Sequence, residues 1–221
     1  MKTHIKICCI QSVDEARMAI DAGADALGLV SAMPSGPGPI HEELIAQIAP
    51  HITSNLWSVL LTSKLTAAEI IAQQRRIGVN TLQLVDAVPL VELANLRREL
   101  PGVRLMQVIH VTGEGSLTQA QEYAPHVDAL LLDSGNPALA IKELGGTGRT
   151  HDWKLSRAIV ESVHVPVFLA GGLNALNVVE AIRIVHPYGV DLCSGVRANG
   201  KLNSERLTSF VKAVAQIESA Y

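Results

Sequence analysis

Two side chains near the start of the chain could take part in acid–base chemistry. Lys6 and Cys8 are two residues apart, so in a β-strand the ammonium and the thiol point to the same side. A lysine inside a fold is costly unless it meets an anion, which would be a substrate phosphate or a thiolate whose pKa the lysine lowers. The alternative is that Cys8 and Cys9 are small buried hydrophobic residues, as most free cysteines are.

A carboxylate at the end of another apolar run is the candidate partner. Asp133 closes the run from Val127 to Leu132 and precedes Ser134. A carboxyl group at the end of a buried strand can act as general acid or base if burial raises its pKa towards the working pH. The alternative is that Asp133 only caps the loop that follows.

Glycines at the ends of two later apolar runs indicate an anion site. Gly171 and Gly172 follow one run, and Ser194 with Gly195 follows the next. Glycine lets backbone N–H groups and a helix N-terminus approach a phosphate closely, although tight turns alone would also use it. Two such segments together favour a phosphate ligand. A third glycine-rich segment, 145–148, contains Gly146 and is long enough after its strand to form a mobile lid.

A recurring phrase marks the elements that must position these residues. It occupies 22–27, 77–82, 125–130 and 188–193, and each copy joins a helical pattern to an apolar run. In three copies a glycine (Gly23, Gly78 and Gly189) stands where a helix needs a left-handed residue to stop. The copies start 55, 48 and 63 residues apart, about the length of two β–α units, so four copies imply eight strands.

The apolar runs predict the strands themselves. They lie near 4–10, 25–30, 55–61, 80–85, 103–110, 127–132, 165–170 and 190–193, with helical spacing between them, as at 12–22 and 65–77. Apolar strands that alternate with helices predict a covered parallel sheet, and eight units fit one α/β domain over 1–221, a (β/α)8 TIM barrel. A doubly wound open sheet is the alternative. In a barrel the candidate residues would share one mouth, at the carboxyl ends of the strands.

Composition excludes several classes of function. The chain has 18 Lys and Arg against 21 Asp and Glu and only 3% aromatic residues, so we expect no nucleic-acid binding. No apolar run approaches the eighteen residues that a membrane span needs, so we expect a cytoplasmic protein without membrane contact. The three cysteines and eight histidines show no disulfide framework and no metal-ligand spacing, so we expect neither a disulfide nor a metal site.

Taken together, these segments resemble the phosphoribosylanthranilate isomerase family of tryptophan biosynthesis. The matching segments occur in the family's order and span nearly the whole chain: Lys6 to Cys8, Ala22 to Gly28, Gln83 with Leu84, Leu131 to Ser134, Gly145 to Gly148 with Asp152 and Trp153, Ala170 to Asn174 with Asn177 and Val178, and Asp191 with Ser194 to Val196.

The resemblance implies a (β/α)8 barrel isomerase that performs an Amadori rearrangement of an aminoaldose phosphate to an aminoketose phosphate, without a cofactor. It implies that Asp133 is the general acid that opens the sugar ring and Cys8 the general base that removes the C2 proton. The loops at Gly171 and Ser194 would hold the phosphate of a small phosphorylated sugar. Lys6, Gln83, Gly146 and Arg197 are further possible substrate contacts. We expect a monomer or a homodimer.

The chain departs from the family at the mouth of the barrel. The family usually has glycine where Cys9 stands, and it has an arginine for the anthranilate carboxylate where Gly38 gives the best match. Losing such a contact costs about ten- to a hundredfold in affinity unless another cation, Arg197 or Arg149, replaces it. Val85 and Asp86 replace the family's His-Gly, and His110 is a further unfamiliar polar group.

Four functions follow from these observations. The first is the family's own isomerase, and the second is an isomerase of a related sugar phosphate that lacks the carboxylate. The third is a barrel that binds a sugar phosphate without turning it over, although mere binding would not need both Cys8 and Asp133. The fourth, a Schiff-base aldolase, would want a lysine near Asp133, where the chain has none.

Overall fold

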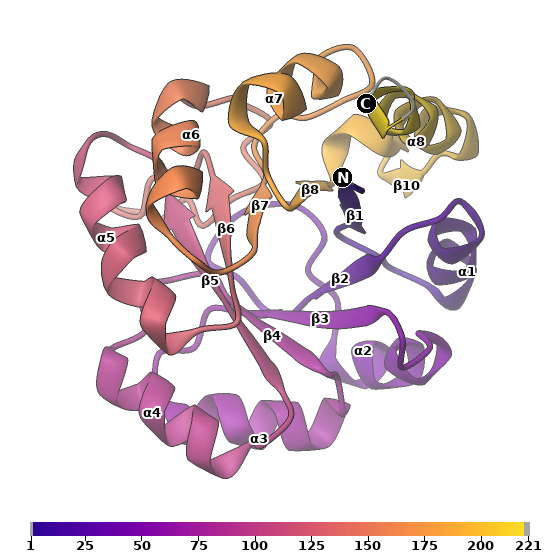
Figure 1. Ribbon diagram of the computed structural model, residues 1–221. Coiled ribbons are helices and arrows are strands. Elements are labelled where there is room, and N and C mark those ends of the chain that lie inside the picture. Colours follow the sequence, from indigo (N-terminus) through magenta and orange to yellow (C-terminus); the bar gives the residue numbers. More distant parts are fainter. Residues whose placement is uncertain (1, 219–221) are drawn as a thin grey trace.

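The computed structural model describes residues 2–218, and eight parallel strands in it close into a barrel in which each strand pairs with the next and β8 pairs with β1. Figure 1 shows the helices arranged around this ring of strands. The strands are β1 (His4–Ile7), β2 (Ala26–Val30), β3 (Trp57–Thr62), β4 (Thr81–Leu84), β5 (Arg104–His110), β6 (Ala129–Asp133), β7 (Val167–Leu169) and β8 (Gly189–Leu192). The predicted (β/α)8 barrel is therefore confirmed.

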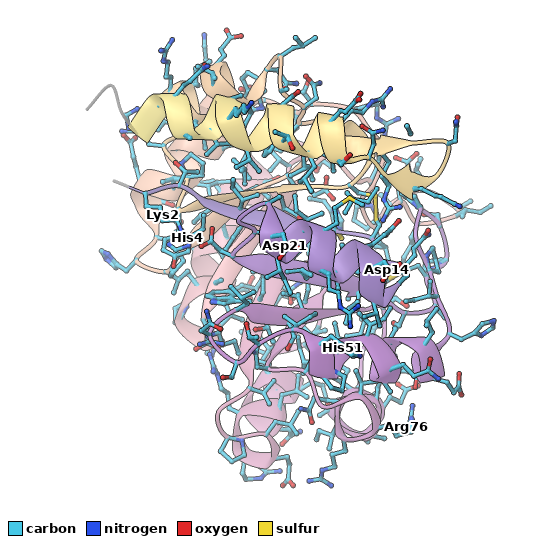
Figure 2. All side chains as sticks on the ribbon, turned by 90° about the vertical axis from the view of Figure 1, so that its right-hand side faces the viewer. Lys2, His4, Asp14, Asp21, His51 and Arg76 are labelled. Atoms are coloured by element: carbon cyan, nitrogen blue, oxygen red, sulfur yellow. A yellow bond between two sulfur atoms is a disulfide. The ribbon has the colours of Figure 1, made fainter. Side chains whose placement is uncertain are left out.

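The helices connect successive strands on the outside of the barrel. They are α1 (Val13–Asp21), α2 (Glu42–Ile48), α3 (Ala67–Ile77), α4 (Leu90–Glu99), α5 (Gly115–Tyr123), α6 (Trp153–Ser162), α7 (Val178–Val185) and α8 (Ser204–Glu218). Short 3-10 helices are η1 (Ala49–His51), η2 (Ala124–His126) and η3 (Ser194–Val196), and a small hairpin joins β9 (Arg197–Ala198) to β10 (Lys201–Leu202). Charged side chains such as Asp14, Asp21 and Arg76 lie on the outer surface of these elements (Figure 2).

Local sequence signals explain where several helices begin and end. Ser12 and Thr66 cap α1 and α3, each accepting a hydrogen bond from the backbone N–H three residues later. Gly78 ends α3 in a left-handed conformation, as predicted. The expectation for Gly189 was wrong, because α7 already ends at His186, which is itself left-handed. Gly189 is instead the first residue of β8.

Gly189 lacks a side chain for a packing reason. A Cβ atom there would lie 2.6 Å from the Phe168 ring and 2.8 Å from the His4 carbonyl oxygen. The glycine thus lets β7, β8 and β1 approach one another where the barrel closes.

The apolar residues form two layers. One large cluster fills the space between the strands and the helices, and a smaller one fills the barrel itself with side chains such as Val59, Met106, Leu131 and Phe168. Because these side chains fill the interior, the barrel is a packed core and any ligand must bind at its mouth.

Strand pairing places the predicted site residues on neighbouring strand ends. Ile7 of β1 pairs with Leu192 of β8, so Cys8 and Cys193 follow at the same edge. His110 of β5 pairs with Asp133 of β6. Since all eight strands are parallel, these residues and the glycines after β7 lie at one mouth.

Candidate active site

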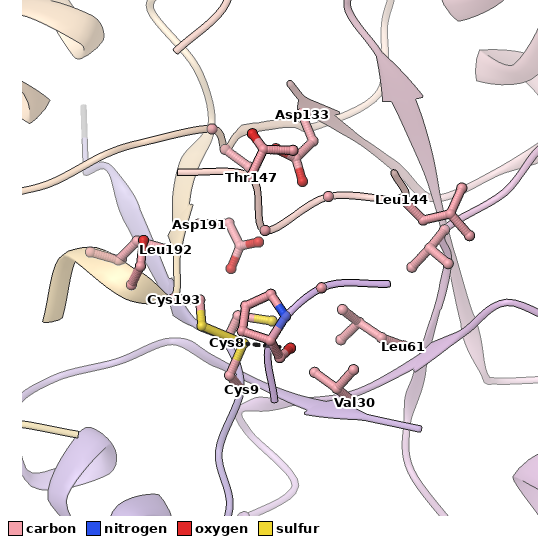
Figure 3. Close-up of a pocket in the computed structure, with 18 of the residues that line it drawn as sticks. Cys8, Cys9, Val30, Leu61, Asp133, Leu144, Thr147, Asp191, Leu192 and Cys193 are labelled. Atoms are coloured by element: carbon pink, nitrogen blue, oxygen red, sulfur yellow. Dashed lines mark hydrogen bonds between the residues drawn. A yellow bond between two sulfur atoms is a disulfide. The ribbon is translucent and has the colours of Figure 1, made fainter. Parts of the chain in front are cut away.

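One pocket at the carboxyl ends of the strands collects most of the predicted site residues. Of the residues singled out from the sequence, those lining it are Cys8, Gln83, Asp133, Gly146, Gly171, Gly172 and Ser194. Figure 3 shows Asp133 on one side of this pocket and Cys8 on the other, with Asp191 between them. The barrel thus brings a thiol and two carboxyl groups from β1, β6 and β8 around one space.

The candidate base lies in a buried charged cluster beneath the pocket. Cys8 follows β1, and its backbone N–H donates to the Leu192 carbonyl oxygen at 2.9 Å, which fixes it against β8. The fully buried Lys6 ammonium donates to Asp191 Oδ1 at 2.9 Å. The predicted anion near Lys6 is therefore first of all a carboxylate of the chain itself. Lys6 lies below the pocket and does not line it.

The charges of this cluster oppose one another at the thiol. Burial raises the pKa of Cys8 to about 11, and the neighbouring carboxylates of Asp191 and Asp133 add to the rise while the Lys6 ammonium opposes it. Burial by itself would lower the pKa of Lys6, but Asp191 and Cys8 together raise it, so the ammonium stays protonated. At neutral pH the resting group is thus the Cys8 thiol beside a permanent cation.

The space for this thiol comes from a glycine on the next strand. A Cβ atom at Gly28 of β2 would lie 2.8 Å from Cys8 Sγ, so only glycine leaves the sulfur its present position.

The candidate acid is a buried carboxyl group. Burial is the main cause that raises the pKa of Asp133, and Asp191 contributes in the same direction, while a hydrogen bond from the Ser134 N–H at 2.7 Å opposes the rise. The elevated pKa favours the protonated form, which is the form that can donate a proton. A Cβ atom at Gly145 would lie 2.3 Å from Asp133 Oδ2, so this glycine lets the loop after β6 pass directly over the carboxyl group.

Backbone groups at the ends of β7 and β8 form the candidate anion site. Gly171 and Gly172 have φ values of +85° and +63°, and their N–H groups donate to no acceptor in the described part of the chain. Ser194 begins η3 at the end of β8. These groups border the same part of the pocket as Gly148, whose Cβ atom would lie 4.0 Å from Ser194 Oγ.

Gly195 contributes to this site indirectly. It does not line the pocket, and a Cβ atom there would lie 2.1 Å from the Leu173 carbonyl oxygen. Glycine at this position therefore lets the loops after β7 and β8 pack together, and the prediction of a direct substrate contact by its own atoms is not supported by the geometry.

The opposite side of the pocket is apolar. It is formed by Val30, Met33, Leu61, Val85 and Leu144, with Gln83 at its border. Gln83 Oε1 is buried and accepts no hydrogen bond from the described residues. No Lys, Arg or His stands among the described residues that line the pocket.

Two loops meet over the mouth. Ser35, after β2, donates its hydroxyl to the Lys142 carbonyl oxygen at 2.6 Å. A Cβ atom at Gly146 would lie 2.5 Å from Pro37 Cδ, so the glycine-rich segment after β6 rests on the segment after β2. This contact joins the loop after β2 to the loop after β6, which the sequence predicts to be a mobile lid.

Neither of the two arginines considered as carboxylate anchors lines the pocket. The guanidinium of Arg197 binds Glu15 Oε2 at 2.6 Å, the Gly200 carbonyl oxygen at 2.7 Å and the Cys9 carbonyl oxygen. Arg149 forms an exposed ion pair with Glu143 at 2.5 Å. The expectation that Arg197 contacts the substrate is corrected, because its guanidinium already binds these groups and does not line the pocket. The sequence does not reveal the contact with Glu15 of α1.

The cysteines also differ from the prediction. Cys9 and Cys193 form a disulfide, and Cys8 remains a free buried thiol. The two partners are 184 residues apart in sequence, but closure of the barrel places the ends of β1 and β8 side by side. Sequence spacing alone carried no signal for such a pair.

Asp191 is a site residue that was not predicted from the sequence, although it lies within a segment that matches the family. Asp191 lines the pocket and is buried in β8 opposite Lys6. A signal existed, since one acidic residue in an apolar strand and one basic residue in another predict a buried pair. His110 lies outside the pocket lining, and its Nε2 is 2.9 Å from the Val85 carbonyl oxygen.

No group of three or more His, Cys, Asp or Glu side chains in residues 2–218 is placed to hold a metal ion. None of the helices in this part of the chain is both long and apolar enough to cross a membrane.

Known proteins share this architecture. A model of the family described as N-(5'phosphoribosyl)anthranilate (PRA) isomerase matches residues 5–213. The N-(5'-phosphoribosyl)anthranilate isomerase of Methanocella arvoryzae is 36% identical over 213 residues, which cover 96% of this chain and 98% of the relative. Isomerase 2 of Methanosarcina mazei is 37% identical, over 94% of this chain and 92% of the relative.

Solved structures agree with these relatives. Phosphoribosyl anthranilate isomerase of Thermotoga maritima superposes with a TM-score of 0.83 at 26% identity, over 97% of this chain and 99% of that one. An isomerase in complex with reduced 1-(o-carboxyphenylamino)-1-deoxyribulose 5-phosphate gives a TM-score of 0.80 at 25% identity, with 97% and 99% covered.

Proposed function

Because this chain belongs to the N-(5'-phosphoribosyl)anthranilate isomerase family, we propose that Cys8 and Asp133 are the base and the acid of its reaction. The enzyme converts an aminoaldose phosphate into an aminoketose phosphate in tryptophan biosynthesis. The observation that carries the assignment is the placement of a buried thiol and a buried carboxyl group across one pocket. An acid and a base so placed can reach two atoms of one small sugar.

The first step needs an acid. Asp133, whose pKa burial raises, protonates the ring oxygen of the ribose, and the ring opens as the anilino nitrogen forms a Schiff base with C1. The Asp133 carboxylate that results is stabilised by the Ser134 N–H.

The second step needs a base. The Cys8 thiolate removes the proton from C2, and the enolamine that forms gives the ketone after proton transfer. Lys6 does not touch the substrate in this proposal. Its ammonium lies beside Cys8 and favours the thiolate, so Lys6 is a positioning residue. Both steps are driven by proton transfer to or from the substrate, and the proposal includes no cofactor or metal.

The remaining groups of the pocket bind the phosphate and the anthranilate ring of the substrate. The phosphate binds at the backbone N–H groups of Gly171 and Gly172 and at Ser194, since these are the groups that suit an anion. The anthranilate ring binds against Val30, Leu61 and the other apolar side chains. A small phosphorylated ligand agrees with the relative that was solved with a deoxyribulose 5-phosphate derivative.

The family also suggests the localisation, the partners and the oligomeric state of the enzyme. We infer a cytoplasmic enzyme that binds neither nucleic acid nor membranes and that acts as a monomer or a homodimer. Among related structures, mutually generated monomers of the dimeric Thermotoga maritima enzyme have been solved. An isomerase of a sugar phosphate without the carboxylate is not favoured, because relatives at 33–37% identity carry the isomerase name.

Complementation tests the function directly. The gene should restore growth to a bacterial strain that requires tryptophan because it lacks this isomerase. The Cys8→Ala variant should fail to restore growth while it accumulates as a folded protein. Purified wild-type protein should also convert phosphoribosylanthranilate in vitro. Absence of turnover by a folded wild-type protein would remove the proposal.

A further inference from the structure

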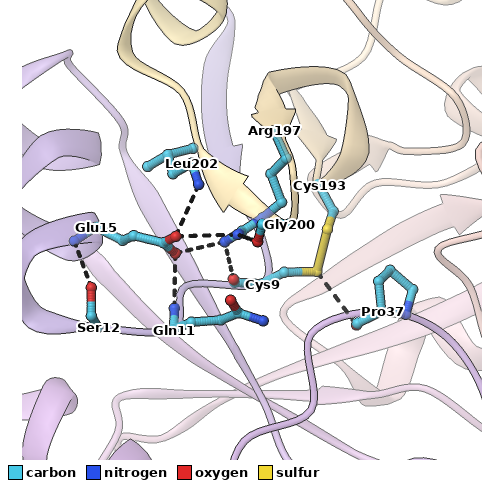
Figure 4. Close-up of polar contacts among 9 residues, drawn as sticks. All are labelled: Cys9, Gln11, Ser12, Glu15, Pro37, Cys193, Arg197, Gly200 and Leu202. Atoms are coloured by element: carbon cyan, nitrogen blue, oxygen red, sulfur yellow. Dashed lines mark hydrogen bonds and ion pairs between the residues drawn. A yellow bond between two sulfur atoms is a disulfide. The ribbon is translucent and has the colours of Figure 1, made fainter.

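Two residues at the barrel mouth are unused by the proposed reaction, although each adjoins a residue that the reaction uses. Cys9 follows the proposed base Cys8, and Cys193 precedes Ser194 of the proposed phosphate site. Their Cα atoms are 5.8 Å apart and their sulfurs are joined (Figure 4). A bond between these residues therefore ties the segment that bears the base to the segment that binds the phosphate.

The backbone of Cys9 adopts a conformation that suits glycine. Its φ is +63°, in the left-handed region where a side chain is disfavoured. The guanidinium of Arg197 binds the Cys9 carbonyl oxygen and is itself held by Glu15, so the surrounding structure maintains this conformation (Figure 4). A sulfur-bearing side chain stands here despite its conformational cost.

The loop after β2 is shaped around the Cys9 side chain. A Cβ atom at Gly38 would lie 2.6 Å from Cys9 Cβ and 2.9 Å from Cys9 Sγ. Gly38 has φ +86°, which only glycine adopts readily. Three positions from three separate segments, 9, 38 and 193, are thus mutually adapted to one sulfur–sulfur contact.

The site can also accommodate the reduced form. Cys9 Sγ is 3.6 Å from the Pro37 carbonyl oxygen, which can accept a hydrogen bond from the thiol once the disulfide is opened. Cys193 is partly exposed and lines the pocket, so a small thiol can approach its sulfur through the mouth. The site therefore accommodates both the disulfide and the two free thiols.

We propose that Cys9 and Cys193 form a reversible thiol–disulfide site that sets the affinity of the enzyme for its phosphorylated substrate. In a cytoplasmic protein, such disulfides are usually transient or redox-sensing and not permanent structural links. The effect on turnover rests on the proposed isomerase function, whereas the existence of the thiol–disulfide site does not.

The chemistry is a thiol–disulfide exchange with a small-molecule disulfide as oxidant. The thiolate of one cysteine attacks a sulfur of the oxidant, and a mixed disulfide forms as one small thiolate leaves. The second cysteine then attacks the mixed disulfide on the protein and releases the other small thiolate. Two protein thiols lose two electrons and two protons, and the oxidant becomes two thiols; a dithiol reverses the reaction.

The disulfide should act on binding more than on the chemical step. Cys8 is held by its own backbone hydrogen bond to Leu192, which does not involve the disulfide, so we expect the base to stay in place on reduction. Ser194, by contrast, follows Cys193 directly and loses the tie when the bond opens. Opening the bond releases the backbone of about one residue, so we expect a KM about five- to thirtyfold higher with little change in kcat.

Cysteine counting tests the chemical part. The protein is incubated with oxidised glutathione or with dithiothreitol, denatured, treated with iodoacetamide and weighed by mass spectrometry. One labelled cysteine is expected after oxidation and three after reduction, and the Cys8→Ala variant should give none and two. Three labelled cysteines after oxidation, or an added glutathione in place of an internal bond, would overturn the proposal.

Kinetics and binding test the functional part. KM for phosphoribosylanthranilate and the Kd for ribose 5-phosphate, by calorimetry, are compared between the two forms, with Cys9→Gly and Cys193→Ser as matched variants in which neither value should respond to dithiothreitol. Equal values for the oxidised and reduced wild-type protein would overturn the link to substrate affinity. If no form turns over the substrate, the isomerase assignment fails, while cysteine counting and ribose 5-phosphate binding still decide this inference.

Discussion

Replacing Asp133 by asparagine should change the shape of the pH profile as well as the rate. In the proposed reaction the competent enzyme has a protonated Asp133 and a Cys8 thiolate. Burial and nearby carboxylates raise the pKa of Cys8 to about 11, and burial raises the pKa of Asp133; we expect the carboxyl group to lose its proton before the thiol, as the ordinary order of these groups suggests. In the pH range between the two titrations, the competent form is then a minor tautomer of the form with a Cys8 thiol and an Asp133 carboxylate.

This order of pKa values predicts a plateau for the wild-type enzyme. Between the two pKa values the pair holds one proton, so the fraction in the competent tautomer does not depend on pH, and kcat/KM should be flat between the titrations of Asp133 and Cys8. The rate should fall at lower pH, where both groups are protonated, and near pH 11, where the pair loses its last proton.

The Asp133→Asn variant lacks the second titrating group. Its residual rate should follow the Cys8 thiolate alone, which amounts to about one molecule in 10⁴ at pH 7 for a pKa of about 11. We expect kcat/KM to rise about tenfold per pH unit between pH 7 and 10, from a value about 10² to 10⁴ below wild type at pH 7. Loss of the Asp133 charge removes one cause that raises the pKa of Cys8, so the rise should level off slightly below pH 11.

The assay is steady-state kcat/KM for phosphoribosylanthranilate from pH 6 to 10.5, with circular dichroism at each pH to establish that the protein stays folded. Asp14→Asn is the control, because the Asp14 side chain is 93% exposed and lies on α1, away from the pocket; it should keep both the rate and the plateau. A flat profile for folded Asp133→Asn would show that Asp133 and Cys8 do not act as the acid–base pair.

Three more predictions concern the residues around the pocket. Gly172→Ala should raise KM, because its side chain would collide with the loop after β6. The control is Gly102→Ala, where φ is also positive but the space around the residue is open; it should cost about 1–2 kcal/mol of stability and leave KM unchanged. Equal effects of the two variants on KM would contradict a local role of Gly172. Gly38→Arg should lower activity, because the Cβ atom of the new residue would collide with Cys9. The loss should be smaller when Cys9→Gly is added. Tighter binding of the substrate carboxylate by Gly38→Arg alone would show that the loop accommodates the side chain without this collision. Arg197→Ala should lower the free energy of unfolding by about 3 kcal/mol in urea titrations, since it leaves a carboxylate unpaired; a raised KM with unchanged stability would instead restore Arg197 as a substrate anchor.

The architecture of this protein follows from local patterns in its sequence. Periodic apolar runs and the repeated helix-to-strand phrase predicted eight strands, because a strand covered on both faces must be apolar throughout and must alternate with helices. The same patterns placed Cys8, Asp133 and the Gly171 loop at strand ends, and the barrel rule then put them at one mouth. That part of the site follows from local chemistry and topology, which a sequence carries directly.

Which side chains face one another depends on how distant segments pack in the folded chain. Arg197 could have reached the substrate from its place after β8, but its guanidinium binds the carboxylate of Glu15 of α1. A competition of this kind depends on distances between segments far apart in sequence, which no spacing reveals.

The disulfide is a second case of this kind. Cys9 and Cys193 are 184 residues apart and form no recognisable motif, and they meet only because β8 closes the barrel against β1. The role of Gly38 is likewise not evident from the sequence, in which it is one of two glycines in a proline-rich loop. In the folded protein, the absence of its Cβ atom provides the space that the Cys9 side chain occupies.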